Sequence, residues 1–249
     1  MKRLFFFLIT ILLATVKLSA QDLLQTANEA YIKGDFTKAI ELYEAVLKEH
    51  GESATVYYNL GNSYYKANQI APSILNYERA LLLDPGNSDI RFNLEIAKLK
   101  TVDKIEPVGE FFLTSWFRSV QNLLSTDAWS KFGIICFILL IGSLFFFFFS
   151  RKILIKKAGF YAGICLLVLT IFGNLFAYNQ EKRLTERNYA IIFAPTTTIK
   201  SSPAESGTDL FILHEGTKVK LKSRIGDWNE IETADGNVGW IKSVEIEVI

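Results

Sequence analysis

Several features that are scarce in this 249-residue chain narrow its possible functions. The 27 basic and 26 acidic residues nearly cancel, leaving a net charge of about +1. A chain without a strong positive field does not favour nucleic acid as a partner.

Residues that could act in catalysis or bind a metal are also few. The two histidines, His50 and His214, lie in different parts of the chain, and no nucleophile or carboxylate pattern surrounds either. The two cysteines, Cys136 and Cys165, each lie within an apolar block and show no metal-ligand spacing. No phosphate-binding loop is present either. The sequence thus predicts a protein that is not an enzyme and uses no cofactor or metal.

Apolar residues make up 50% of the chain and gather in three blocks, at residues 4–16, 132–149 and 158–178. The first block follows Lys2 and Arg3, is too short to span a membrane comfortably, and ends in KLSA. This pattern predicts a signal peptide over residues 1–20, cleaved after Ala20. An uncleaved anchor is the alternative, and both would export the segment that follows.

The exported segment contains an internal repeat with a period of 34 residues. In this register Ala27 matches Gly61, and Tyr31 matches Tyr65, so small and aromatic residues recur at fixed offsets. The pattern resembles the tetratricopeptide repeat. This resemblance implies two repeats and a capping helix over residues 21–100, with the cap at residues 88–100.

Tetratricopeptide repeats bind peptides or partner helices on the surface of their inner helices, and the resemblance assigns that role to one set of residues here. They are Asn28, Tyr31, Ile32, Tyr58, Asn62, Tyr65, Lys66 and Phe92. Some family members clamp a terminal carboxylate, and Asn28 and Asn59 match the asparagines of that clamp. Its basic positions hold Leu24, Asp89 and Asn93 instead, so the clamp is not expected here.

A linker with an amphipathic helix is predicted at residues 101–128. Phe112, Trp116, Val120 and Leu123 recur there at helical spacing, which suggests a helix on the membrane surface or one packed on the repeats. Residues 129–150 and 158–178 then read as two transmembrane helices. Their apolar runs contain no Asp, Glu, Lys or Arg, so no ion path is expected.

Basic residues predict the orientation of this membrane hairpin. Arg151, Lys152, Lys156 and Lys157 crowd the short loop at residues 151–157, which places the loop in the cytoplasm. The signal peptide gives the same orientation. The repeats and the C-terminal segment would then both face the periplasm of a bacterial inner-membrane protein. Gly159 and Gly163 form a small-residue pair that is expected to pack the hairpin, with recruitment of another membrane protein as the alternative.

The C-terminal segment, residues 187–249, reads as short strands between glycine-containing turns. Its Gly226–Asp227–Trp228 turn and the GNVGWI stretch at residues 236–241 resemble a bacterial SH3-like domain, which implies a small all-β barrel. Phe211, Trp228 and Trp240 could line a ligand groove there or pack the barrel. Because some such domains bind cell-wall peptides, a peptidoglycan-binding sensor is the alternative function.

The order of the modules along the chain also resembles that of a known family. An all-α tetratricopeptide-repeat solenoid, a two-helix transmembrane hairpin and an all-β SH3-like barrel together resemble the BatE family of the Bacteroides aerotolerance (Bat) operon. This resemblance implies a non-catalytic scaffold linked to aerotolerance or envelope stress. It also implies the lipid bilayer, von Willebrand A-domain Bat membrane proteins and, indirectly, a MoxR-type ATPase as partners.

Overall fold

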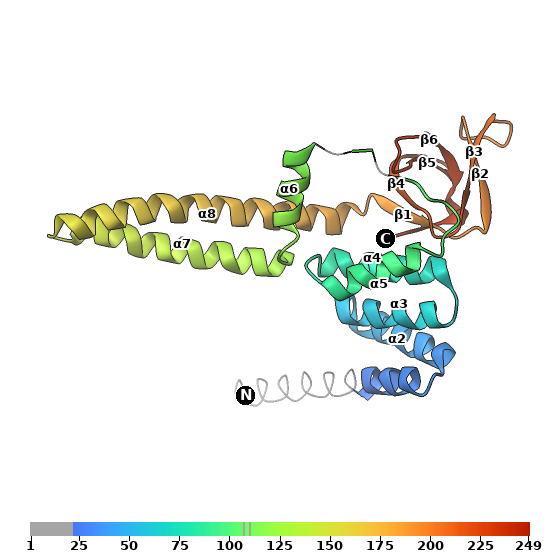
Figure 1. The fold of residues 1–249 in the computed structure, drawn as a ribbon, viewed down its shortest axis with the longest axis horizontal. Helices are drawn as coiled ribbons and strands as arrows, with labels where there is room; N and C mark the ends of the chain where they lie inside the picture. Colours follow the sequence, from blue (N-terminus) through green and yellow to red (C-terminus); the bar gives the residue numbers. More distant parts are fainter. Residues whose placement is uncertain (1–21, 107, 110) are drawn as a thin grey trace, which may run out of the picture. The chain divides into compact units, whose positions relative to one another are not determined.

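The computed structural model describes residues 22–106, 108–109 and 111–249. The signal peptide predicted over residues 1–20 lies outside the described residues. The chain forms two compact units, which are described separately (Figure 1). Of the described residues, the first comprises 22–81, 87–109 and 188–249, and the second comprises 82–86 and 111–187.

The first unit contains the predicted helical repeats. Residues 22–32 are helical, and α2 (Phe36–His50), α3 (Ala54–Lys66), α4 (Ile70–Leu83) and α5 (Ser88–Lys98) follow. The turns between paired helices use left-handed backbone at Gly34 and Asn68, with φ of 78° and 61°. Glycine and asparagine adopt this conformation more readily than other residues. The two helical pairs and the capping helix predicted from the 34-residue period are therefore present.

Gly61 allows close packing in the second helical pair. A Cβ at this position would lie 2.7 Å from Cδ1 of Tyr77, which is closer than side chains normally approach. Ser73 Oγ donates a hydrogen bond to the carbonyl oxygen of Gly61 at 2.9 Å. Small residues thus bring α3 and α4 together, and the tyrosine ring fills the space beside them.

The C-terminal part of the first unit is a seven-stranded antiparallel sheet. Its elements are β1 (Tyr189–Ile192), β2 (Thr196–Lys200), β3 (Asp209–His214), β4 (Lys218–Ile225), β5 (Trp228–Glu232), β6 (Val238–Lys242), the short helix η1 (Ser243–Glu245) and β7 (Ile246–Val248). The strand order is β3-β2-β6-β5-β4-β1-β7, so β3 and β7 are its edges. The antiparallel sheet is confirmed, whereas closure into a barrel stays a prediction.

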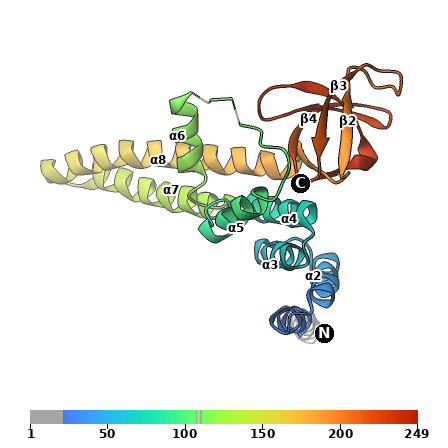
Figure 2. The ribbon, with the colours of Figure 1, turned by 45° about the vertical axis from the view of Figure 1, so that its right-hand side comes forward.

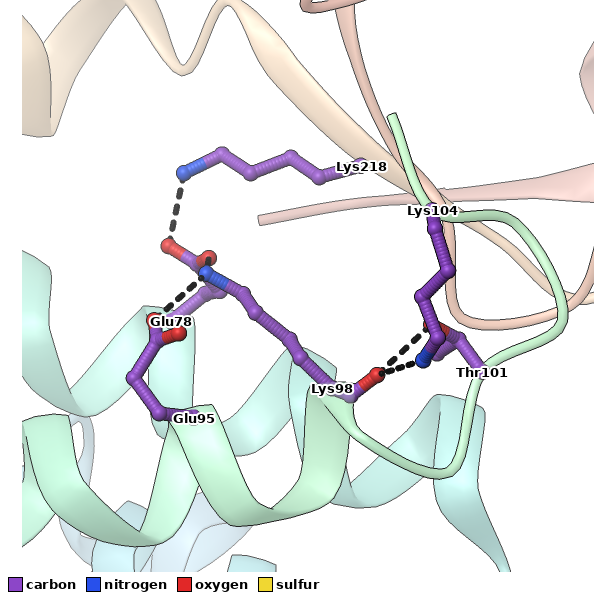
Figure 3. Close-up of polar contacts among 6 residues, drawn as sticks. All are labelled: Glu78, Glu95, Lys98, Thr101, Lys104 and Lys218. Carbon is purple, nitrogen blue, oxygen red and sulfur yellow. Dashed lines mark hydrogen bonds and ion pairs between the residues drawn. The ribbon is translucent and has the colours of Figure 1, made fainter. Parts of the chain in front are cut away.

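Glu78 joins the repeats to the sheet within the first unit. Its carboxylate lies 2.6 Å from Nζ of Lys218 on β4 and 3.4 Å from Nζ of Lys98 on α5 (Figure 3). The Glu78 side chain is only 9% exposed. Burial by itself would raise the pKa of this carboxyl, but the charges of Lys218 and Lys98 and their hydrogen bonds outweigh it. The pKa of Glu78 therefore lies below its usual value.

The segment that follows α5 is also attached to the sheet. Asp103 accepts hydrogen bonds from the backbone N of His214 and from Oγ1 of Thr217, each at 2.7 Å. Ile105 packs against the core of the sheet, and the backbone N of Val108 donates to the carbonyl oxygen of Ala234 at 3.0 Å. The first part of the linker predicted at residues 101–128 thus packs as part of the domain, because Ile105 gains by burial.

The second unit is built on an antiparallel pair of long apolar helices, α7 (Thr126–Phe149) and α8 (Ile153–Glu186). They run side by side in both views (Figures 1 and 2). Both are long and apolar enough to cross a membrane. The connection between them is shorter than the loop predicted at residues 151–157, because α8 begins at Ile153 and includes Lys156 and Lys157. Nothing in the sequence ILIKKA breaks a helix, so α8 starts early.

Glycines allow close contact between these two helices, as the sequence predicts. A Cβ on Gly159 would lie 2.9 Å from the carbonyl oxygen of Ser143. Ser143 Oγ donates to the carbonyl oxygen of Gly159 at 2.6 Å. Gly163 is also buried, with Ser143 and Leu140 as its neighbours. The pair Gly159 and Gly163 therefore packs the hairpin, which confirms that prediction.

The amphipathic helix predicted in the linker is α6 (Phe112–Gln121), and it packs on the helical pair of its own unit. Phe117 meets Phe176 of α8 edge-on, with ring centroids 4.9 Å apart. Val120 packs against the same cluster, whereas Phe112 and Trp116 stay exposed. The predicted apolar stripe thus has a packed, partly buried part, at Val120, and an exposed part, at Phe112 and Trp116. Val120 packs inside the unit because removing its side chain from water is favourable.

Candidate functional site

The first helix of each repeat and the capping helix α5 together carry all eight residues predicted to bind a partner. Three of them, Ile32, Lys66 and Phe92, are exposed, and the exposed fractions of Ile32 and Phe92 reach 81% and 66%. The other five are half-buried: Asn28, Tyr31, Tyr58, Asn62 and Tyr65. Accessible apolar side chains thus stand beside half-buried polar ones on this surface.

Asn28 is held by a hydrogen-bond network in the first repeat. Its Oδ1 accepts a bond from the hydroxyl of Tyr43 on α2 at 2.7 Å. The same oxygen lies 3.4 Å from the donating Nδ2 of Asn59 on α3. The side chain of Asn28 therefore connects its own helix both to the paired helix and to the next repeat.

The second repeat builds the same network one period later. Asn62 Oδ1 accepts from the hydroxyl of Tyr77 at 2.7 Å and from Nδ2 of Asn93 at 2.9 Å. Asn93 Nδ2 also donates to the hydroxyl oxygen of Tyr58 at 3.0 Å. The structure thereby brings together two predicted residues, Tyr58 and Asn62, through an asparagine of the capping helix.

The repeated network leaves the amide nitrogens of two asparagines available. Within the described part of the chain, Nδ2 of Asn28 and Nδ2 of Asn62 have no hydrogen-bond partner. Neither atom is buried without a partner, so both are accessible to solvent. Their oxygens are already used, which fixes the amide orientation and turns both groups into donors. The site can therefore donate hydrogen bonds to carbonyl oxygens at two points one repeat apart.

Two tyrosines in and beneath this surface, Tyr31 and Tyr43, have a raised pKa and are neutral at physiological pH. Burial, and then the neighbouring Tyr31, raise the pKa of Tyr43 to about 12. Burial, and then the neighbouring Tyr58, also raise the pKa of Tyr31. Nearby positive charge comes from Lys66 and from Lys100, whose Nζ lies 4.3 Å from the centroid of the Tyr65 ring. Positive charge therefore lies close to Tyr65 on this surface.

Three contributors to this surface were not selected from the sequence: Asn59 and Asn93, which were considered only as positions of the carboxylate clamp, and Lys100. Asn59 and Asn93 occupy equivalent positions in the 34-residue register, as do Asn28 and Asn62. The recurrence of this asparagine pair was the available signal for a shared network. Lys100 lies beyond the last repeat position, so no periodic signal marks it.

The residues predicted to form a groove in the sheet lie on two different faces. Phe211 packs against the core of the sheet. Trp228 and Trp240 alternate with buried neighbours on β5 and β6 and are half-exposed, so they lie on the outer face. Nζ of Lys242 lies 5.7 Å from the centroid of the Trp228 ring. The two tryptophans can thus share a surface, whereas Phe211 belongs to the core.

The residues predicted to set the membrane orientation lie together at one end of the α7–α8 pair. Arg151 and Lys152 connect the helices, and Lys156 and Lys157 lie in the first turns of α8. All four are exposed. Among the described residues, no group of three or more His, Cys, Asp or Glu side chains could hold a metal ion.

Comparisons with known proteins identify the repeats. A family model described as tetratricopeptide repeat matches residues 54–87, and one described as TPR repeat matches residues 27–68. No curated protein matches the chain. These models cover the residues that form the asparagine and tyrosine network, apart from Asn93 of the capping helix.

Among solved structures, the chain is similar to the type III secretion chaperone SycD of Yersinia enterocolitica, crystallised with a peptide of the translocator YopD. The two are 12% identical with a TM-score of 0.32, over 61% of this chain and 93% of that one. A likeness at this level assigns neither a fold nor a ligand. The family models and the observed strands do assign the architecture: the chain contains tetratricopeptide repeats within residues 27–87 and a C-terminal antiparallel β-sheet domain.

Proposed function

We propose that this protein is a non-catalytic scaffold whose repeat surface binds an extended segment of another protein. The observation that carries the proposal is the combination of accessible Ile32 and Phe92 with the available Nδ2 donors of Asn28 and Asn62. An extended segment offers carbonyl oxygens at regular intervals and side chains between them, so it can engage both kinds of group.

We further propose that α7 and α8 cross the bacterial inner membrane as a hairpin, with Arg151, Lys152, Lys156 and Lys157 in the cytoplasm. The 2.6 Å ion pair between Glu78 and Lys218 supports this arrangement. One residue precedes both helices and the other follows both, so the two must lie on the same side of the membrane. A hairpin of two spans meets that requirement.

Cysteine labelling tests this orientation. Thr37→Cys on α2 and Val244→Cys on η1 both place a thiol at an exposed position, in a background with Cys136 and Cys165 changed to alanine. We expect a membrane-impermeant maleimide to label the thiols at positions 37 and 244 from the periplasmic side. It should label Lys156→Cys only after the membrane is permeabilised. Labelling of Lys156→Cys from the periplasm would refute the orientation.

The module order supports a BatE-like role in a Bat-type complex linked to aerotolerance or envelope stress. Under this proposal the bound segment belongs to a von Willebrand A-domain membrane protein. A cytoplasmic MoxR-type ATPase would act on this protein only indirectly, since the hairpin exposes little chain on that side. The partner's identity rests on the resemblance, whereas the binding surface rests on the residues above.

Photo-crosslinking from the repeat surface tests the scaffold. A crosslinking amino acid at Phe92 is expected to capture a protein partner in intact membranes, and Ile32→Asp on a different helix should abolish that capture. Both positions are exposed, so neither change disturbs the core. Thr37→Asp, on the outer helix α2, is the matched control and should leave capture unchanged. Capture that survives Ile32→Asp would refute a shared surface.

Cell-wall peptide binding through the sheet is the alternative function, supported by the half-exposed Trp228 and Trp240 on its outer face. Retention of the full chain on purified peptidoglycan, lost on Trp240→Ala, would favour this function. No retention, together with capture at Phe92, would favour the scaffold.

A further inference from the structure

α6 carries an exposed aromatic flank. Phe112 and Trp116 are 72% and 58% exposed, and Leu113 beside them is also exposed. At 3.6 residues per turn, Phe112 and Trp116 lie about 40° apart around the helix, whereas Arg118 lies roughly 200° from Trp116. The N-terminal part of the helix therefore exposes apolar side chains on the same flank on which Val120, further along, packs inside the unit.

The C-terminal end of α6 is fixed to both long helices of its unit. Buried Gln180 of α8 donates from Nε2 to the carbonyl oxygens of Gln121 and Leu124, at 2.8 Å each. Nε1 of Trp129 on α7 also donates to the carbonyl oxygen of Gln121 at 2.8 Å. These bonds, with the Phe117 contact, hold α6 as a rigid part of the unit.

The point of attachment lies where the apolar sequence of α8 ends. Gln180 follows the apolar run at residues 158–178, and the charged residues Glu181, Lys182 and Arg183 come directly after it. A membrane-spanning α8 would pass through the headgroup region at this level. In both views α6 lies across the α7–α8 pair rather than along it (Figures 1 and 2).

We propose that α6 is an in-plane helix at the outer surface of the membrane, with Phe112, Leu113 and Trp116 inserted between lipid headgroups and acyl chains. This inference rests on the proposed membrane hairpin. A helix perpendicular to two spans lies parallel to the bilayer surface, where helices with one apolar flank bind and tryptophan is enriched. Because α6 packs directly on α7 and α8, whose apolar side chains are largely exposed, the lipid around those helices is also the occupant of this flank.

Depth measurement by electron paramagnetic resonance tests this inference on the full chain in nanodiscs of phosphatidylethanolamine and phosphatidylglycerol. A nitroxide is attached to Leu113→Cys or, as the matched control on the opposite side of α6, to Ser115→Cys, with both native cysteines changed to alanine. We expect the ratio of collisions with oxygen to collisions with a water-soluble nickel chelate to be severalfold higher at position 113.

Native Cys165 separates failure of this inference from failure of the proposed hairpin. It is exposed on α8 within the apolar run, so Cys136→Ala leaves one label that reports on the span. A high oxygen ratio at Cys165 with equal ratios at positions 113 and 115 would overturn the in-plane helix alone. A label at position 113 shielded from both reagents would also overturn it, since a protein would then cover the flank. A low ratio at Cys165 would overturn both proposals.

Discussion

Replacing Glu78 with glutamine tests how strongly the repeats are tied to the sheet. The change keeps the size of the side chain and removes its charge, so Lys98 and Lys218 each lose an ionic partner. Glu78 is the residue that contacts α5 and β4 at once. Its loss should therefore loosen the junction within the first unit without altering the second.

The expected loss of stability depends on how deeply Glu78 and its two lysine partners are buried. At an effective dielectric constant of about 20, unit charges about 4 Å apart attract by roughly 4 kcal/mol. Moving the carboxylate out of water costs several kcal/mol, which cancels much of the gain from two such pairs. Lys218 and Lys98 are 35% and 37% exposed, so water can solvate both once Glu78 is neutral. We expect the free energy of opening the junction to fall by about 2 kcal/mol, below the 3–5 kcal/mol range for fully buried pairs.

Hydrogen–deuterium exchange of the full chain in detergent measures this change. A loss of about 2 kcal/mol corresponds to roughly thirtyfold faster exchange in peptides of α5 and β4, since about 1.4 kcal/mol is a factor of ten. Glu95→Gln is the matched control, because Glu95 pairs with the same Lys98 at 3.3 Å but is 65% exposed. An exposed pair contributes at most about 1 kcal/mol. Equal effects of the two substitutions would refute the reasoning.

Acid should weaken the same junction. The pKa of Glu78 is lowered in the folded protein, so the stabilisation is present above the unfolded-state pKa of about 4.3. It is lost as the pH falls through the lower folded-state pKa. The Glu78→Gln protein should lack this part of the acid response, and an unchanged acid response would contradict the assignment.

Three further changes are expected to act through packing or buried polar contacts. Gly159→Ala should lower the thermal stability of the hairpin in detergent, because its Cβ would meet Ser143, while Gly142→Ala, with open space around it, should not. Gly61→Ala should lower the free energy of unfolding of the repeats by roughly 1–3 kcal/mol in chemical denaturation, since its Cβ would overlap Tyr77. Asp103→Asn should cost about 1.5–3 kcal/mol locally and speed amide exchange at His214, whose backbone N it anchors.

The sequence predicted the repeated helical pairs and the long apolar helices of the fold. A 34-residue period and small residues at fixed offsets are local signals, so the helical pairs and Gly61 could be placed in advance. The end of α8 could not, because the apolar run stops near Tyr178 while the helix continues to Glu186. No residue between these points breaks a helix, and the turn comes only at Arg187, with a left-handed φ of 40°.

The polar contacts of the candidate site were harder to predict. Asn28 and Asn62 were selected from their place in the repeat, but their hydrogen bonds depend on side-chain orientation across three helices. Glu78 and Lys218 stand 140 residues apart in the chain, and neither has a sequence pattern that points to the other. Such pairs arise from tertiary packing alone, so composition and periodicity carry no signal for them.

The same ion pair constrains the proposed membrane topology in a way that charge counting does not. The basic residues around Arg151 indicate which side the connection occupies, but they do not show that both long helices cross. Glu78 and Lys218 share a compartment because they are 2.6 Å apart, so an even number of crossings must separate them. With α7 and α8 as the two candidate spans between these residues, either both cross or neither does. An arrangement in which only one helix spans is inconsistent with the repeat–sheet junction.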